Sequence, residues 1–150
     1  MRPQSFINAL LATEDIRFRE HSGIDIRALF RAIFGVVSGK GQAGGASTIT
    51  QQLAKMLFTK TPASGVDRVK QKLKEWVIAA KLERRYTKDE IMLMYLNRYD
   101  WVNNAVGIES AARVYFNKEP KNLNIQESAT LVGMLKNSAL YNPNRRLELT

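Results

Sequence analysis

The chain has no cysteine, a single histidine and only four prolines among its 150 residues. Without cysteine it cannot be a disulfide-stapled domain, although this absence does not separate the cytoplasm from an extracytoplasmic compartment. No hydrophobic run approaches the length of a membrane span, and the first residues do not read as a signal peptide. No cluster of histidine, cysteine and aspartate could build a dedicated metal cage, so the sequence predicts no resident metal site.

Acidic residues are also scarce, with 14 Asp and Glu against 23 Lys and Arg and a formal charge of +9. This excess favours a polyanionic partner: nucleic acid, an anionic membrane surface or a phosphorylated substrate. Most aromatic residues fall at helical spacing beside aliphatic ones, as core residues do, which argues against nucleic-acid binding. A hydrophobic content of 45% with 25% charged residues is typical of one soluble domain.

Helical periodicity runs through most of the chain, and no alternating strand pattern of useful length occurs, so the predicted fold class is all-α. The expected helices cover residues 4–14, 24–37, 46–58, 67–85, 91–97, 107–116 and 126–136. A capping box at residues 87–90 is expected to open the fifth helix, and Asn124 to cap the last.

Two of these helices carry apolar stripes, and the sequence predicts where each stripe lies in the fold. In residues 24–37 the stripe fits a core helix or a membrane-surface helix, and the pattern alone favours the core. This stripe consists of Leu29, Phe30, Ile33, Phe34 and Val37. In residues 67–85 we expect a buried side and a neighbouring polar stripe. The expected buried side is Val69, Leu73, Trp76, Val77 and Ala80, and the polar stripe is Arg68, Lys72, Glu75 and Ala79.

Two glutamates stand out as candidates for chemistry. Glu14 ends the first helix on or beside its apolar stripe, where a carboxylate is either capped and solvated or, in a cleft, able to accept a proton. Glu75 has Lys72, Lys74 and Arg68 nearby and is expected to stay ionised. In many enzymes one carboxylate of such a pair acts as the general base, and the other stays charged and acts electrostatically. The alternative for Glu75 is an ordinary salt-bridge cluster on the protein surface.

A glycine-rich stretch, residues 38–45, leads into the third helix, with Ser47 or Thr48 as its expected N-cap. Glycines, hydroxyl groups and free backbone N–H groups at a helix start can form an anion site. Ser47, Gln51 and Lys55 follow at a spacing of four and share one face. The plainer alternative is a capped amphipathic helix whose polar side chains face water.

Taken in order, these segments resemble the motifs of glycosyltransferase family 51, the peptidoglycan glycosyltransferase domain of class A penicillin-binding proteins and of monofunctional enzymes. The first motif is matched by Glu14, Asp15, Phe18, His21 and Gly23. The second is matched by Gly45, Ser47, Thr48, Ile49, Thr50, Gln51, Gln52, Leu53 and Lys55, and the third by Lys72 and Glu75. The fourth is matched by Tyr95, Leu96, Asn97, Gly107, Ile108, Ala111, Ala112, Tyr115 and Phe116, and the fifth by Glu127, Ala129, Leu131 and Gly133.

The sequence departs from the family pattern at a few positions. Gln71 stands where the third motif usually has arginine, and Met56 where the second often ends in asparagine. Val102 and Asn104 replace glycines that are common in the turn before the fourth motif's helix. The lost arginine removes a cation near Glu75, which Arg68 or Lys74 could replace.

The resemblance implies a lysozyme-like large lobe with a small membrane-associated jaw at about residues 24–45. It implies that residues 1–150 are one catalytic module, without the N-terminal membrane anchor or transpeptidase domain of larger members. The expected activity is polymerisation of lipid II into β-1,4 glycan strands, with inversion and release of undecaprenyl diphosphate. The expected location is the extracytoplasmic face of the bacterial cytoplasmic membrane, with lipid II, the growing glycan, the anionic membrane surface and cell-wall synthesis proteins as partners and no nucleic acid.

The same resemblance assigns roles to residues. Glu14 is the expected general base and Glu75 the second catalytic carboxylate, while His21 is expected to be structural. The expected substrate-binding residues are Asp15, Phe18, Ser47, Thr48, Gln51, Gln52, Lys55, Arg68, Lys72 and Lys74. No cofactor is expected to be tightly bound, although Mg²⁺ or Mn²⁺ could accompany the substrate diphosphate. Inhibition of the moenomycin type is a further expectation.

Two alternatives stay open on the sequence alone. A lysozyme-like glycan hydrolase or lytic transglycosylase would also use one glutamate, but it needs no diphosphate site. A non-catalytic basic helical module would bind membranes or polyanions with steep salt dependence and no effect of Glu14→Gln.

Overall fold

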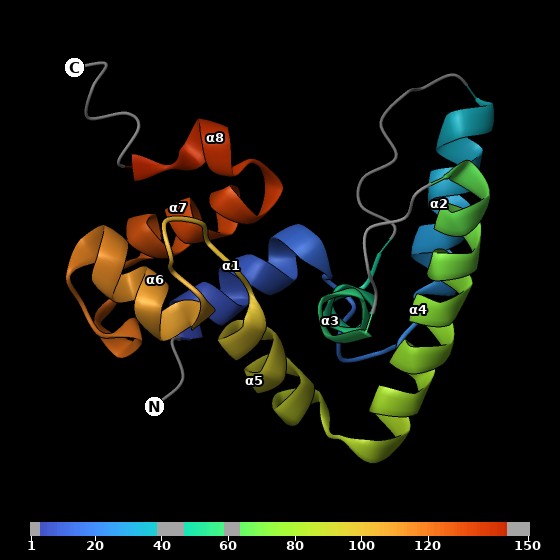
Figure 1. Ribbon diagram of the computed structural model, residues 1–150, viewed down its shortest axis with the longest axis horizontal. Coiled ribbons are helices and arrows are strands. Elements are labelled where there is room, and N and C mark those ends of the chain that lie inside the picture. Colours follow the sequence, from blue (N-terminus) through green and yellow to red (C-terminus); the bar gives the residue numbers. More distant parts are fainter. Residues whose placement is uncertain (1–3, 39–46, 59–63, 144–150) are drawn as a thin grey trace. The chain divides into compact units, whose positions relative to one another are not determined.

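The computed structural model describes residues 4–38, 47–58 and 64–143 of the chain. Helices supply the regular structure in these ranges, which confirms the predicted all-α class (Figure 1). They are α1 (Gln4–Glu14), α2 (Ile26–Val37), α3 (Ile49–Phe58), α4 (Gly65–Arg85), α5 (Lys88–Arg98), α6 (Gly107–Phe116), η1 (Pro120–Asn122), α7 (Ile125–Lys136) and α8 (Ser138–Tyr141). Extended pairing in the described ranges is limited to one antiparallel bridge between Asp100 and Val106.

The helix boundaries follow local capping chemistry. The α1 and α6 helices have the predicted bounds, and the Asn124 side chain forms the expected capping box with Glu127 at the start of α7. The Thr87 backbone N–H donates to Glu90 Oε2 over 2.7 Å, so α5 begins at Lys88, earlier than the apolar run alone suggested. The short helices η1 and α8 were not predicted, because neither is long enough to show a periodicity.

Internal packing divides the chain into two compact units. The first comprises Met1–Thr13 and Leu96–Thr150, and the second comprises Glu14–Tyr95. In the first unit, Phe6 of α1 and Trp101 are almost fully buried and meet edge to face, with ring centroids 6.0 Å apart. The Trp101 Nε1–H donates to the Leu131 carbonyl of α7 over 3.0 Å, so this buried indole keeps a hydrogen-bond partner.

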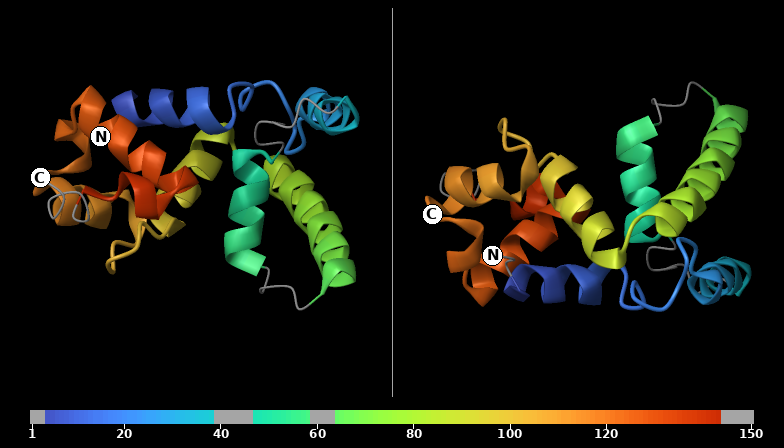
Figure 2. Two further views of the ribbon diagram at one scale, coloured as in Figure 1. Left: turned by 90° about the horizontal axis from the view of Figure 1, so that it is seen from above. Right: turned by 90° about the horizontal axis from the view of Figure 1, so that it is seen from below.

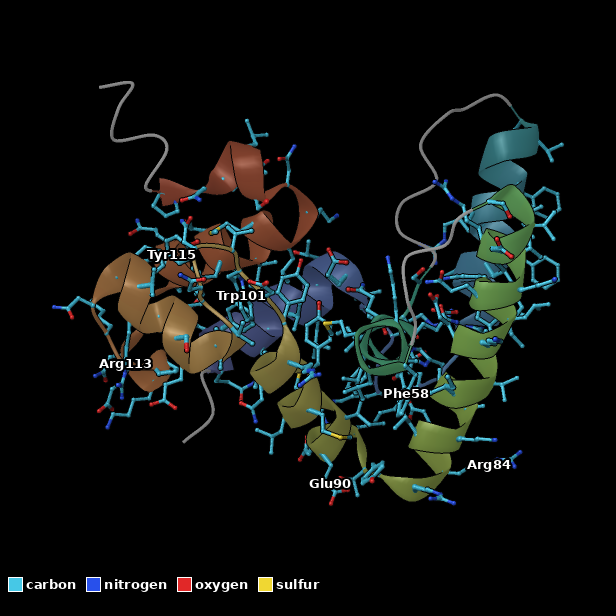
Figure 3. The ribbon with its side chains drawn as sticks, viewed as in Figure 1. Phe58, Arg84, Glu90, Trp101, Arg113 and Tyr115 are labelled. Carbon is cyan, nitrogen blue, oxygen red and sulfur yellow. The ribbon has the colours of Figure 1, made fainter. Side chains whose placement is uncertain are left out.

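The turn before α6 is fastened to the same core. The Tyr115 hydroxyl donates to the Trp101 carbonyl over 2.6 Å, and Figure 3 labels both side chains. Val102, Asn103 and Asn104 all have positive φ angles, between 51° and 61°. This left-handed region favours glycine and is rare for a β-branched residue. Two of the three positions are those where the sequence departs from the family's glycines.

In the second unit, α3 packs against α4, and Figure 1 shows α3 end-on beside the length of α4 (Figures 1 and 2). Ile49 and Leu53 of α3 and Ala79 of α4 are fully buried. The Thr50 hydroxyl donates to Glu83 Oε1 over 2.6 Å and joins the two helices near the start of α3. This pair of helices carries most of the residues singled out in the sequence.

The predicted buried side of α4 was wrong. Val69, Leu73 and Val77 are 54–62% exposed, whereas Glu75 and Ala79 of the predicted polar stripe are buried. Close approach explains the reversal, because a Cβ on Gly23 would lie 3.0 Å from the Ala79 backbone. Hydrogen bonds explain why Glu75 can be buried, because its carboxylate accepts from two side chains within the second unit.

The α2 helix does not contribute a buried stripe either. Phe30, Ile33 and Phe34 are each more than half exposed, so the core environment favoured by the pattern alone was wrong. The predicted jaw at about residues 24–45 stays a prediction, because residues 39–45 lie outside the described ranges. Among the described helices, none combines the length and the apolar character needed to cross a bilayer.

Candidate active site

Glu14 is the last residue of α1, and α3 and α5 supply the side chains around it in the second unit. Its Oε2 accepts a hydrogen bond from Gln52 Nε2 over 3.1 Å. The Gln52 Oε1 in turn accepts from the Tyr95 hydroxyl over 3.0 Å. Glu14 Oε1 is buried and has no hydrogen-bond partner within the described part of the chain. One carboxylate oxygen is therefore held, and the other remains able to accept a proton or a hydrogen bond.

Asp15, next in the sequence, has a different environment. Its carboxylate is buried and accepts from His21 Nε2 and from the Ile49 backbone N–H, both over 3.0 Å. The Gly23 backbone N–H donates to His21 Nδ1, so Nε2 carries the imidazole hydrogen. Asp15 therefore ties the segment after Glu14 to the N-terminus of α3, where a negative charge is favourable. This geometry agrees with the structural role predicted for His21.

Thr48 is the N-cap of α3. Its hydroxyl accepts from the Gln51 N–H over 3.1 Å, and the Gln51 side chain accepts from the Thr48 N–H over 3.3 Å. This is a capping box with glutamine at the third helical position. The Thr48 hydroxyl also donates to the Gly23 carbonyl over 2.7 Å. Both side chains are 2% exposed, so their described contacts are with protein.

Phe18 is buried beneath a lysine that the sequence did not single out. Lys88 Nζ lies 4.5 Å from the centre of the Phe18 ring, and it donates to the His21 carbonyl over 2.6 Å and to Glu83 Oε1 over 2.7 Å. A cation over an aromatic face is attractive, particularly when both groups are partly desolvated. Lys88 thereby fastens the segment that follows Glu14 to the C-terminal part of α4.

Glu75 is the centre of a second cluster. Its Oε1 accepts from Gln71 Nε2 and its Oε2 from Lys72 Nζ, each over 3.1 Å. Lys72 Nζ also donates to the Ser47 hydroxyl over 2.9 Å. The buried Glu75 carboxylate thus has one cation and one neutral amide as partners, while Lys72 connects α4 to the residue before Thr48. Gln71 occupies the place of the family's arginine and still donates to Glu75.

The remaining predicted cations are on the surface. Lys55, Arg68 and Lys74 are exposed. No described hydrogen bond or ion pair joins Arg68 or Lys74 to Glu75, so the structure does not bring the expected replacement cations to this carboxylate. Residues 39–45 of the predicted glycine-rich stretch lie outside the described residues. Substrate contact by all the predicted binding residues stays a prediction.

Sequence reasoning missed two residues that hold this site together. Tyr95 was noted only as part of a motif, and Lys88 only as part of a capping box. Their contacts join segments far apart in the chain, which periodicity cannot reveal. Within residues 4–38, 47–58 and 64–143, no group of three or more His, Asp and Glu side chains could hold a metal ion.

Comparison with known proteins places this arrangement in a family. The family model described as Transglycosylase matches residues 2–150. The chain is 43% identical over 142 residues to penicillin-binding protein 1A of Pseudomonas aeruginosa, 40% over 141 residues to penicillin-binding protein 1F of Bacillus subtilis and 44% over 142 residues to penicillin-binding protein 1A of Aquifex aeolicus. Each match covers 94% of this chain but only 17–19% of the relative. Because the family model spans almost all of the sequence, the chain belongs to the transglycosylase family of glycosyltransferases.

Proposed function

We propose that this domain is a peptidoglycan glycosyltransferase that polymerises lipid II, with Glu14 as the general base. The observation that carries the proposal is the Glu14 carboxylate, with Oε2 held by Gln52 and Oε1 buried without a partner among the described residues. A base must be positioned and also keep an acceptor site for the proton it removes. The family match and the names of the relatives support the reaction class.

The proposed reaction is a single inverting displacement. The 4-hydroxyl of a lipid II acceptor attacks the anomeric carbon of the donor chain, and its proton passes to Glu14 Oε1. The new β-1,4 bond forms as the bond between that carbon and the diphosphate oxygen breaks, and the bonding electron pair leaves with the lipid diphosphate. An α-linked donor then gives a β product without a covalent enzyme intermediate.

The cluster around Glu75 carries hydrogen-bond donors that suit the diphosphate leaving group. Negative charge grows on the diphosphate as it departs, and fixed donors that face it lower the barrier. Lys72 and Ser47 are already joined to each other, and Lys55 is exposed on α3. In the proposal these groups bind the diphosphate, and Glu75 keeps Lys72 in place. A Mg²⁺ or Mn²⁺ ion that accompanies the substrate diphosphate would add positive charge beside the leaving group.

We assign a positioning role to the buried members of the predicted binding set. Asp15, Phe18, Thr48 and Gln51 are at most 7% exposed, and each has a described partner within the protein. They fix Glu14 and the start of α3 relative to one another instead of touching the sugar. Removing one of them should therefore cost folding stability as well as activity.

The proposed location is the extracytoplasmic face of the bacterial cytoplasmic membrane, where a lipid-linked substrate is accessible. Exposed apolar side chains on α2 and on α4 and the charge of +9 suit an anionic lipid surface. The other proposed partners are the growing glycan and further cell-wall synthesis proteins, as expected for a relative of penicillin-binding proteins.

The decisive experiment compares the native chain with Glu14→Gln on labelled lipid II in detergent. The variant keeps the shape of the side chain but loses the base, so we expect polymerisation to fall by about 10²–10⁴-fold while lipid II still binds. Glu20→Gln is the matched control, because Glu20 is 64% exposed and pairs with Arg17 at the surface. Its rate should equal that of the native chain.

Two outcomes would contradict the proposal. Polymerisation by Glu14→Gln at the native rate would exclude Glu14 as the base. Cleavage of preformed glycan with lipid II left untouched would instead favour the hydrolase alternative.

A further inference from the structure

The hydrogen bonds of Glu14 continue into the interior of the second unit. The Tyr95 side chain on α5 is fully buried, and its hydroxyl donates to Gln52 Oε1 over 3.0 Å. The Gln52 Nε2 donates to Glu14 Oε2 over 3.1 Å. Three elements distant in sequence are thus linked through one carboxamide, with the phenol at the inner end and the carboxylate at the outer end.

The direction of these hydrogen bonds has a chemical reason. An ionised carboxylate can only accept, so the Gln52 carboxamide must turn its N–H₂ group toward Glu14. That orientation leaves Gln52 Oε1 in need of a donor, which the Tyr95 hydroxyl supplies. A flipped carboxamide would place its oxygen against the carboxylate oxygen, with repulsion in place of a hydrogen bond. The phenol supplies that donor and thereby stabilises the orientation of Gln52 that holds Glu14.

We propose that Tyr95 is a positioning residue for the general base and that it acts through Gln52. This inference rests on the proposed function, because it assumes that Glu14 removes the acceptor proton. The hydroxyl of Tyr95 donates to Gln52, and Gln52 donates to Glu14. With the phenol in place, Oε2 is the occupied oxygen of Glu14 and Oε1 the oxygen that receives the proton. Without it, Gln52 can turn and the carboxylate loses its fixed orientation.

The kinetic test uses Tyr95→Phe, which removes only the hydroxyl. We expect kcat for lipid II polymerisation to fall about three- to ten-fold, the range for one lost neutral hydrogen bond, with KM changed less than two-fold. Tyr115→Phe is the matched control, because Tyr115 also has a buried hydroxyl that donates, in its case to the Trp101 carbonyl. This control should lower stability without lowering kcat.

A double-mutant cycle separates positioning from a general structural effect. If Tyr95 acts through Gln52, adding Tyr95→Phe to Gln52→Ala should not lower kcat further. If the two losses multiply instead, Tyr95 does not act through Gln52 and the inference is overturned.

A spectroscopic measurement decides the point independently of activity. In ¹⁵N-labelled full chain, the Gln52 side-chain amide resonances should move in Tyr95→Phe and in Glu14→Gln but not in Tyr115→Phe. Unchanged resonances in Tyr95→Phe would overturn the inference. If the native chain fails to polymerise lipid II, the proposed function and the catalytic part of the inference fail together, while the amide resonances still report whether Tyr95 orients Gln52.

Discussion

Gln71 shows how one side chain alters the setting of a buried charge. It lies one turn before Glu75 on α4 and gives that carboxylate a neutral donor where the family pattern has arginine. A buried carboxylate oxygen deprived of its donor carries a desolvation cost of about 1–3 kcal/mol.

We therefore expect Gln71→Leu, which keeps the approximate size, to lower the free energy of unfolding by about 1–3 kcal/mol. Gln71→Arg should restore a donor, with a charge-assisted bond to Glu75, and should be at least as stable as the native chain. Urea unfolding followed by circular dichroism measures both. Equal stability of the leucine variant and the native chain would show that Gln71 does not support Glu75.

At the scale of single residues, the sequence singled out the candidate side chains but not all of their partners. Glu14, Glu75, Lys72 and Gln52 were all singled out, and each lies in one of the two clusters. The partner of Gln52, Tyr95, lies 43 positions away and was missed, because a hydrogen bond between distant segments leaves no local pattern. The positions of Val102 and Asn104 were noted as unusual, but their left-handed backbone follows from the turn's own hydrogen bonds.

Among the elements, α7 shows how a capping box responds to pH. The Lys118 ammonium and then the Asn124 backbone N–H donate to Glu127, and together they lower the pKa of its carboxyl. A carboxyl group whose pKa is lower in the folded than in the unfolded protein contributes to stability at pH values above its unfolded pKa. This contribution is lost as the pH falls through the folded pKa.

We expect the melting temperature of the native chain to fall as the pH drops below about 4.5, the ordinary pKa of a glutamate carboxyl. Glu127→Gln should lose part of this dependence, because glutamine does not titrate. Calorimetry from pH 7 to pH 3 on both proteins measures the difference. Glu90→Gln in the α5 capping box is a parallel case, since two hydrogen bonds from Thr87 lower the pKa of Glu90. Parallel curves for native and Glu127→Gln proteins would contradict the assignment.

Helix positions were predictable because caps and periodicity are local. The orientation of α4 was not, because tertiary contacts bury the side that the apolar pattern did not favour. Glu75 is buried because Lys72 and Gln71 supply its hydrogen bonds. Ala79 is buried because the Gly23 backbone lies close to it. Three apolar residues on the other side were left exposed as a consequence.

For the whole molecule, the exposed apolar residues and the net charge lead to a prediction about lipid binding. Phe34 on α2 is 69% exposed, and inserting such a ring into lipid is worth roughly 1.5–3 kcal/mol. Phe34→Ser should therefore weaken binding to phosphatidylglycerol vesicles about ten-fold or more. Sedimentation with vesicles at low and high salt measures this, and added salt should weaken binding by native chain and variant alike.

Ile125→Ser is the matched control, because Ile125 at the start of α7 is 78% exposed and lies in the other unit. It should bind as the native chain does. An equal loss in both variants would indicate nonspecific hydrophobic adsorption and would contradict a lipid-facing role for α2.

The first unit is discontinuous in sequence, and this has a consequence for the order in which the protein folds. Phe6 and Ser5 of α1 meet Trp101 and Ser128, so α1 gains its partners only after most of the chain has been synthesised. Glu14–Tyr95, by contrast, forms its contacts within one continuous segment. Contacts between distant segments form slowly, and chains emerge from the ribosome N-terminus first. The segment that carries Glu14 and Glu75 can therefore complete its packing while α1 still awaits its partners, and closure of the first unit becomes the late step of folding.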